Sequence, residues 1–128
     1  MNKANTEYLI KKYPSLYKYY NKGIKTSAMC WGFDCGDGWF DLIDMLSFFI
    51  TRIDPNVTAL QVKEKWGMLA FYVGPTEDRV FDLIDRYVAA SKHVCEICGK
   101  DGKLRCRNGW YMTRCEECFE KDIHSESR

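Results

Sequence analysis

The amino-acid sequence predicts an α+β fold in which helices pack on a small antiparallel sheet, followed by a separate cysteine-rich unit. Three observations carry this prediction: apolar residues recur at helical spacing in three segments, one β-hairpin spans 57–73, and two close cysteine pairs follow residue 94. We therefore divide the chain into an α+β body over 1–92, a cysteine-rich unit over 93–122 and a polar, frayed tail over 123–128.

The three helical segments lie on either side of the hairpin. The first covers 5–21, is rich in lysine, and is divided or kinked by Pro14. The second covers 37–53, and the third covers 78–92 after an acidic cap. These segments supply enough apolar surface for one compact body.

The hairpin over 57–73 alternates apolar and polar residues and turns at Gly67. Because large aromatic side chains dominate small cores, we expect Trp39, Trp66 and Phe71 to be buried anchors. Hydrophobic residues make up 46% of the 128 residues and aromatic residues 15%, which favours a packed domain over disorder.

Charge and hydropathy exclude several classes of protein. The formal net charge is +1, so the whole molecule lacks both the basic field that attracts nucleic acid and the acidic surface of a DNA mimic. No apolar run approaches the roughly 18 residues of a membrane span, and the first residues do not read as a signal peptide. We expect a cytoplasmic protein without a membrane partner, whose seven cysteines are reduced.

The cysteine pairs have the spacing of a metal site. Cys95 and Cys98 form one CxxC knuckle, and Cys115 and Cys118 form a second, with Asn108-Gly109 between them as a hairpin turn. A two-stranded ribbon about this turn brings the knuckles together, and four thiolates close a tetrahedral site. We predict one structural Zn²⁺ ion in a zinc ribbon; two disulfides or a redox dithiol are the alternatives. No role is predicted for the remaining cysteines, Cys30, Cys35 and Cys106.

One face of this ribbon is predicted to be basic. Period-two alternation places four basic residues and one large aromatic residue on the same side as Met112. We predict these five as the binding residues for a partner: Lys103, Arg105, Arg107, Trp110 and Arg114. Such a face suits a phosphate backbone, with the tryptophan stacked on a base. The alternative is that the positive charges only balance the thiolates and neighbouring acids.

A cluster of aspartates near the second helix raises the question of catalysis. Acids in a first helical turn are favoured by the helix dipole, and this explains the cluster better than a divalent-metal or acid–base site does. No nucleophile with a base and no phosphate-binding loop accompanies it. We therefore predict that the protein is not an enzyme; a metal-dependent nuclease using Asp34, Asp37, Asp41 and Asp44 is a distant alternative.

Three blocks of the chain resemble a family of small uncharacterised proteins of bacteria, bacteriophages and prophages, whose pattern is GDGWxxLI, VKEKFGxLRFY and a terminal pair of cysteine knuckles. The blocks are 36–43, 61–72 and the knuckle region with Gly109-Trp110-Tyr111, and the chain departs from the pattern at Trp66, Met68 and Ala70. The resemblance implies an accessory protein of a mobile element rather than an enzymatic activity.

Two hypotheses follow from these observations. The first is a non-enzymatic, zinc-ribbon-containing accessory protein of a phage or prophage that binds a host or defence protein. The second is an accessory protein that binds nucleic acid through the basic face of the ribbon.

Overall fold

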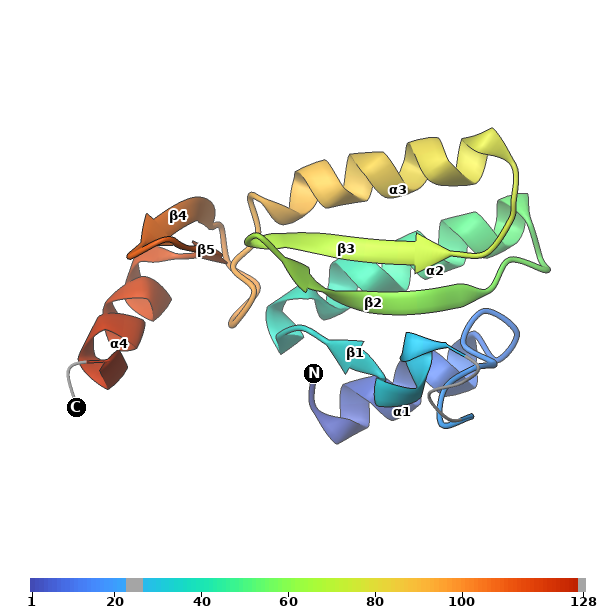
Figure 1. The fold of residues 1–128 in the computed structure, drawn as a ribbon, viewed down its shortest axis with the longest axis horizontal. Helices are drawn as coiled ribbons and strands as arrows, with labels where there is room; N and C mark the ends of the chain where they lie inside the picture. Colours follow the sequence, from blue (N-terminus) through green and yellow to red (C-terminus); the bar gives the residue numbers. More distant parts are fainter. Residues whose placement is uncertain (23–26, 127–128) are drawn as a thin grey trace.

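The computed structural model describes residues 1–22 and 27–126, with side chains described as far as Lys121, and it confirms the α+β class (Figure 1). In chain order the elements are α1 (Lys3–Lys12), η1 (Ala28–Trp31), β1 (Phe33–Asp34), η2 (Asp37–Trp39), α2 (Phe40–Ile53), β2 (Ala59–Lys65), β3 (Met68–Val73), α3 (Asp78–Ser91), β4 (Lys103–Arg107), β5 (Trp110–Arg114) and α4 (Glu116–Glu126). None of the described helices has the length and apolar character needed to cross a membrane.

The body contains a three-stranded sheet in the order β1-β2-β3. β2 and β3 form the predicted antiparallel hairpin, with Val62 opposite Phe71. β1 pairs in parallel with β2, which the sequence did not predict because a two-residue strand carries no readable alternation. Residues 23–26 lie outside the described part of the chain.

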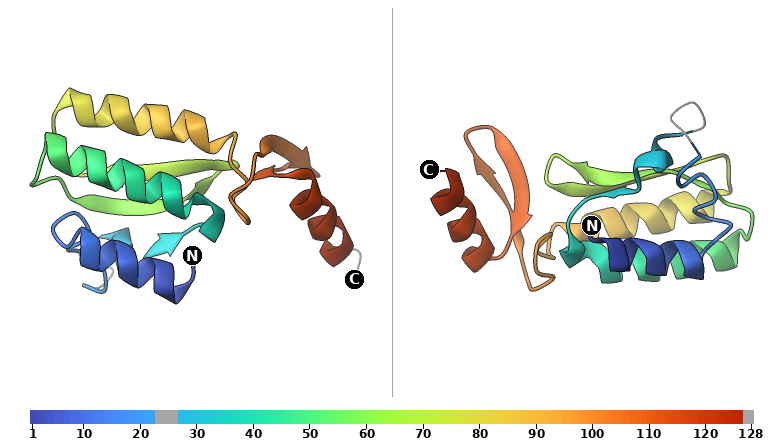
Figure 2. Two further views of the ribbon diagram at one scale, coloured as in Figure 1. Left: turned by 180° about the vertical axis from the view of Figure 1, so that it is seen from behind. Right: turned by 90° about the horizontal axis from the view of Figure 1, so that it is seen from below.

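All three long helices of the body lie on one side of the sheet. Figure 2 shows α1, α2 and α3 in one layer, with α2 in the middle. Lys63 follows the fully buried Val62 in β2, so its side chain faces the opposite side of the sheet. Apolar side chains fill the space between the two layers, as expected for a sheet with one covered face. The largest fully buried residues of this core are Trp39, Tyr17, Leu9, Leu16, Met29, Ile43, Leu46 and Ile50.

The first helix is shorter than predicted. α1 ends at Lys12, whereas the predicted helix continued to residue 21. Pro14 explains the early end, because a proline ring disfavours helical backbone at the preceding residue, and Tyr13 has φ −125° and ψ 63°. The second half of the prediction is therefore wrong: the chain turns there, although Leu16 is still fully buried.

Trp66 is not a core anchor. Trp39 and Phe71 are buried as predicted, but 65% of Trp66 is exposed. The reason is its place in the hairpin turn: Trp66 and Gly67 have φ of 56° and 82°, the left-handed backbone of a two-residue turn. A tryptophan in this conformation points away from the core at the tip of the hairpin.

The C-terminal unit extends from one end of the sheet (Figure 1). β4 and β5 form the predicted hairpin about Asn108 and Gly109, and α4 follows them. α4 runs through Glu126, into the segment where the sequence suggested a frayed tail, and residues 127–128 lie outside the described part. We call residues 93–122 the ribbon.

Candidate metal centre

Two tight local structures present the four cysteine thiols. The first knuckle closes where Gly99, at φ 81°, donates its N–H to the carbonyl of Cys95 at 2.9 Å. A left-handed backbone favours glycine at that position. In the second knuckle, Cys115 precedes α4 and its sulfur accepts the N–H of Cys118 at 3.4 Å. The β4–β5 hairpin joins the two knuckles.

The four thiols lie together as predicted. The sulfurs of Cys95, Cys98, Cys115 and Cys118 are all within 4.8 Å of one another, and those of Cys98 and Cys115 are 3.6 Å apart. Four thiolates around one tetrahedral ion, at about 2.3 Å each, stand about 3.8 Å apart. The observed spacing therefore fits one metal ion. It is far beyond the ~2.05 Å of a disulfide bond, and the seven cysteines are free thiols.

The electrostatics of the cluster also favour a cation. Burial raises the pKa of Cys95, but hydrogen bonds from the backbone of Cys115, Cys98 and Ile97 outweigh it and lower that pKa to about 7. Burial and the neighbouring thiols raise the pKa of Cys118 to about 12. Without a cation the four thiols cannot ionise together, because each thiolate opposes the next. The environment of Cys95 thus favours one thiolate in the cluster, whereas ionisation of the other three thiols requires a bound cation.

A buried carboxylate fixes the first knuckle to the body. One oxygen of Glu96 accepts the backbone N–H of Gly36 at 2.8 Å, and the other accepts Arg114 Nη1 at 3.1 Å. The carbonyl of Glu96 accepts the N–H of Gly38, also at 2.8 Å. Glu96 thus connects the body, the knuckle and β5, a role that sequence reasoning missed because the two inner residues of a CxxC pair carry no positional signal.

The Gly-Asp-Gly-Trp segment before α2 is the matching surface on the body. A Cβ atom on Gly38 would lie 2.0 Å from the carbonyl oxygen of Cys95, so only glycine permits this approach. The buried indole of Trp39 donates its N–H to the carbonyl of Val94 at 2.8 Å. This segment, which leads into α2, is therefore also the place where the first knuckle rests on the body.

The tip of the β2–β3 hairpin forms the second attachment. Thr113 is fully buried and donates its hydroxyl to the carbonyl of Gly67 at 2.6 Å. Gly67 packs against Leu104 and the β5 backbone, and the ring of Trp66 meets that of Tyr111 edge to face at 6.5 Å. The body therefore holds the ribbon at two places. The Gly-Asp-Gly-Trp segment contacts the first knuckle, and the tip of the β2–β3 hairpin contacts β5.

The basic face of the ribbon forms in the predicted register. Arg105 lies opposite Met112 and Arg107 lies opposite Trp110, so these side chains share one face of the hairpin. Lys103 and Arg114 are paired in the same register. The alternation read from the sequence is confirmed.

Helix α4 occupies much of that face. The guanidinium groups of Arg105 and Arg107 lie 4.7 and 4.0 Å from the centre of the Phe119 ring, and Arg107 also donates to the Phe119 carbonyl at 3.0 Å. Arg114 forms a largely buried ion pair with Glu96. Of the five predicted binding residues, Lys103 and Trp110 are exposed and the three arginines are partly buried, so most of the positive charge serves packing within the ribbon.

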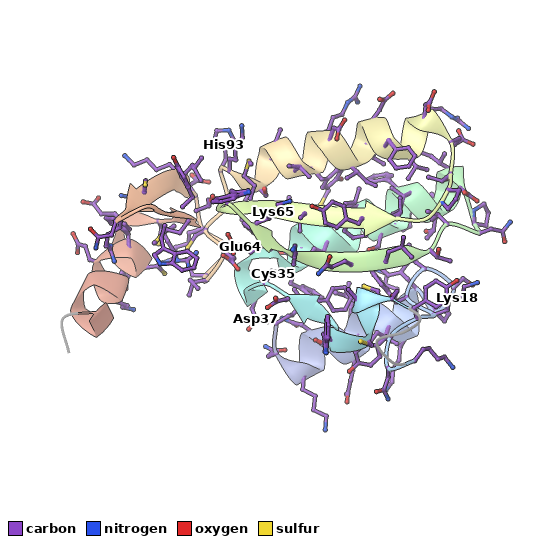
Figure 3. All side chains as sticks on the ribbon, in the orientation of Figure 1. Lys18, Cys35, Asp37, Glu64, Lys65 and His93 are labelled. Carbon is purple, nitrogen blue, oxygen red and sulfur yellow. The ribbon has the colours of Figure 1, made fainter. Side chains whose placement is uncertain are left out.

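Three aromatic residues gather where the ribbon meets the hairpin tip. Trp66, Trp110 and Tyr111, which we call the junction aromatics, line a hollow of about 210 Å³ together with Glu64 and Lys65. Figure 3 places Glu64 and Lys65 at the ribbon end of the sheet. Trp66 and Trp110 are 65% and 72% exposed, which is unusual for tryptophan in a packed protein.

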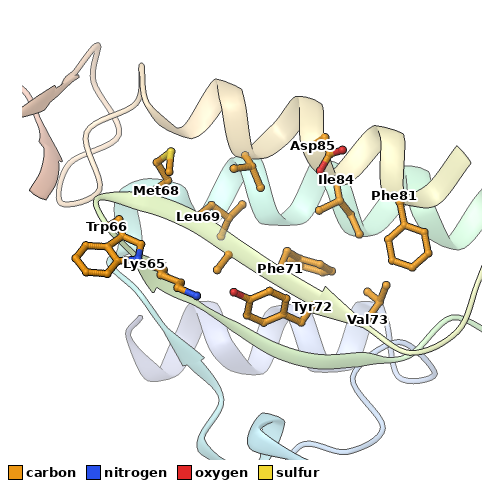
Figure 4. A pocket seen from close by; sticks show the side chains of 12 residues that line it. Lys65, Trp66, Met68, Leu69, Phe71, Tyr72, Val73, Phe81, Ile84 and Asp85 are labelled. Carbon is orange, nitrogen blue, oxygen red and sulfur yellow. The ribbon is translucent and has the colours of Figure 1, made fainter. Parts of the chain in front are cut away.

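A longer apolar groove of about 370 Å³ begins at the same place and runs between β3 and α3 (Figure 4). Lys65 and Trp66 line both the hollow and the groove, and exposed Tyr72 and Phe81 stand farther along the groove. The junction aromatics therefore lie at one end of a continuous apolar surface.

The aspartate cluster is not assembled as a metal site. Among the described residues, the four cysteines are the one group of three or more acids, cysteines or histidines placed to hold an ion. Asp37 instead accepts the N–H of Asn2 at 2.7 Å, and Asp44 accepts the hydroxyl of Tyr13 and the ammonium of Lys12. Asp37 in η2 and Asp44 in α2 thus hold the two ends of α1.

Comparison with known proteins adds no relative: no protein-family model, no curated protein and no solved structure matches the chain.

Proposed function

We propose that the cluster holds one structural Zn²⁺ ion. The proposal is supported by four thiolate donors at tetrahedral spacing, which leave no open position for a substrate and suit a soft, redox-inert ion. Iron is the competing ion for four sulfur ligands. Protein purified without added metal is expected to contain one equivalent of zinc per chain by elemental analysis; a red, iron-containing product or a metal-free folded protein would overturn the assignment.

We further propose that the protein is a non-enzymatic binding protein and that its partner docks on the junction aromatics. The observation that carries this proposal is the exposure of two tryptophans that line one hollow where the ribbon meets the hairpin tip, because aromatic anchors that become buried on binding dominate protein recognition. The metal would then act by fixing Trp110 and Tyr111 against the body. The sequence resemblance suggests a phage or prophage accessory protein whose partner is a host or defence protein.

Truncation of the junction aromatics is expected to abolish capture of the partner. In pull-downs from host lysate, Trp66→Ala and Trp110→Ala are each expected to reduce recovery of a specific protein by tenfold or more, since an aromatic hot spot contributes about 2 kcal/mol or more. Trp31→Ala is the matched control, because Trp31 is 66% exposed and lies on η1, away from the ribbon. Equal loss in all three variants, or none in the junction variants, would contradict the proposal.

Single-stranded nucleic acid is the second candidate partner. Lys65 borders the junction aromatics and Lys63 lies on the same side of β2, so bases could stack while phosphates meet the lysines. In this case the captured material is nucleic acid, and binding weakens steeply with added salt. Arg105 and Arg107, engaged with Phe119, contribute less than the original prediction required.

A further inference from the structure

The outer face of α2 carries large apolar side chains, although the exposed face of a surface helix is normally polar. Helix α2 buries Ile43, Leu46 and Ile50 against the sheet, yet Met45, Phe48 and Phe49 on its other side are 51%, 37% and 41% exposed. A helix with apolar residues all round is normally covered on all sides. Seen from behind the sheet, α2 stands in the middle of the helical layer with no other element in front of it (Figure 2, left).

The charged residues on this outer face have opposite signs at its two ends. Asp41, Met45, Phe48 and Arg52 follow one another at spacings of four, three and four residues, which places them on one stripe of the helix. The Arg52 guanidinium lies 4.3 Å from the centre of the Phe48 ring, so these two side chains are neighbours on the stripe. Asp41 and Arg52 are both exposed.

We propose that this stripe is a two-fold interface, in which α2 packs antiparallel to α2 of a second copy of the chain. The spacings between its four residues, four, three and four, read the same from either end of the helix. An antiparallel copy centred between Leu46 and Ser47 therefore places Asp41 opposite Arg52 of the other chain twice, and Met45 opposite Phe48 twice.

Charge complementarity singles out a second copy as the occupant. The stripe carries an acid at one end and a base at the other, and reversing it produces the complementary pattern, which is the requirement of an isologous interface. Pairing over a helix of 14 residues, about 21 Å long, lies at the small end of specific interfaces. We expect dimerisation in the micromolar range, and this interface is distinct from the surface at the junction aromatics.

Charge reversal tests the pairing directly. Sedimentation equilibrium of the metal-loaded full chain, from about 1 to about 100 µM at low salt, is expected to show reversible dimers. Asp41→Arg and Arg52→Asp should each weaken dimerisation roughly tenfold or more, because both symmetry-related ion pairs become repulsive. An equimolar mixture of the two variants should regain dimers, since one chain then offers two arginines and the other two aspartates.

The controls are charge reversals on the opposite face of the sheet. Asp34→Arg and Lys63→Asp change the net charge by the same amounts, and both residues lie on neighbouring strands away from α2. They should leave dimerisation unchanged. A monomeric wild-type chain at about 100 µM would overturn the proposal and leave the face to a different protein. A mixture that stays monomeric, or single variants that dimerise like the wild type, would also overturn it.

Discussion

Replacing Cys95 by serine is expected to release the metal and unfold the ribbon while the body stays folded. Cys95 is fully buried and is the cysteine whose pKa is lowered, so its loss removes the ligand best prepared to bind. Structural zinc contributes about 10 kcal/mol or more to small zinc domains, far more than a ribbon of this size gains from its own core. NMR spectra should keep dispersed signals for residues 1–92 and lose those of the ribbon.

Cys106→Ser is the matched control for this experiment. Cys106 lies in β4 of the same ribbon, is exposed, and stands outside the cysteine cluster. The variant should keep one equivalent of metal and the wild-type spectrum. If Cys95→Ser keeps both a full equivalent of metal and a folded ribbon, the four-cysteine centre is wrong; if the whole chain unfolds, the ribbon and the body form one cooperative unit.

The parts of the fold that the sequence predicted are those with local periodic signals. α2, α3 and the two hairpins follow from apolar spacing and from glycine turns, which are encoded within a few residues of each other. The short strand β1 was missed because it exists only through pairing with β2. The stretch after Pro14 was wrongly assigned as helix because buried residues such as Leu16 recur there by tertiary packing and not by helical periodicity.

The candidate metal ligands were predictable from the sequence, whereas the contacts that attach the ribbon to the body were not. The spacing of two CxxC pairs about an Asn-Gly turn reports a local structure, and the four sulfurs meet as expected. Glu96, Gly38 and Thr113 act across long sequence separations, so no local pattern marks them. The same holds for Phe119. Its ring contacts Arg105 and Arg107, which we had predicted from the alternation of the strand to be available to a partner.

The attachment gives a physical meaning to two of the three blocks on which the resemblance rests. The block at 36–43 receives the first knuckle, and the block at 61–72 contains the hairpin tip that receives Thr113. Both motifs therefore lie where the ribbon meets the body. We infer that the pattern encodes a fixed ribbon orientation, which a binding surface built from both units requires.

Gly38→Ala is expected to detach the ribbon without removing its metal. The added Cβ would lie 2.0 Å from the carbonyl oxygen of Cys95 and 2.6 Å from the carbonyl carbon of Glu96, and these are backbone atoms, which cannot give way as the end of a flexible side chain can. The knuckle must then withdraw, losing the Glu96 and Trp39 hydrogen bonds. We expect a loss of about 3 kcal/mol in the free energy of unfolding, measured by urea denaturation, with zinc still at one equivalent.

Gly109→Ala separates this clash from backbone strain. Gly109 has φ 84° at the tip of the ribbon, and a Cβ there meets no atom within 4 Å, so the variant should cost only about 1 kcal/mol. Detachment also predicts a specific signature: Trp39, fully buried beneath the knuckle, should become accessible to a fluorescence quencher in Gly38→Ala and remain protected in Gly109→Ala. If the two variants are equally stable and equally protected, the close approach of the body to the knuckle does not hold the ribbon in place.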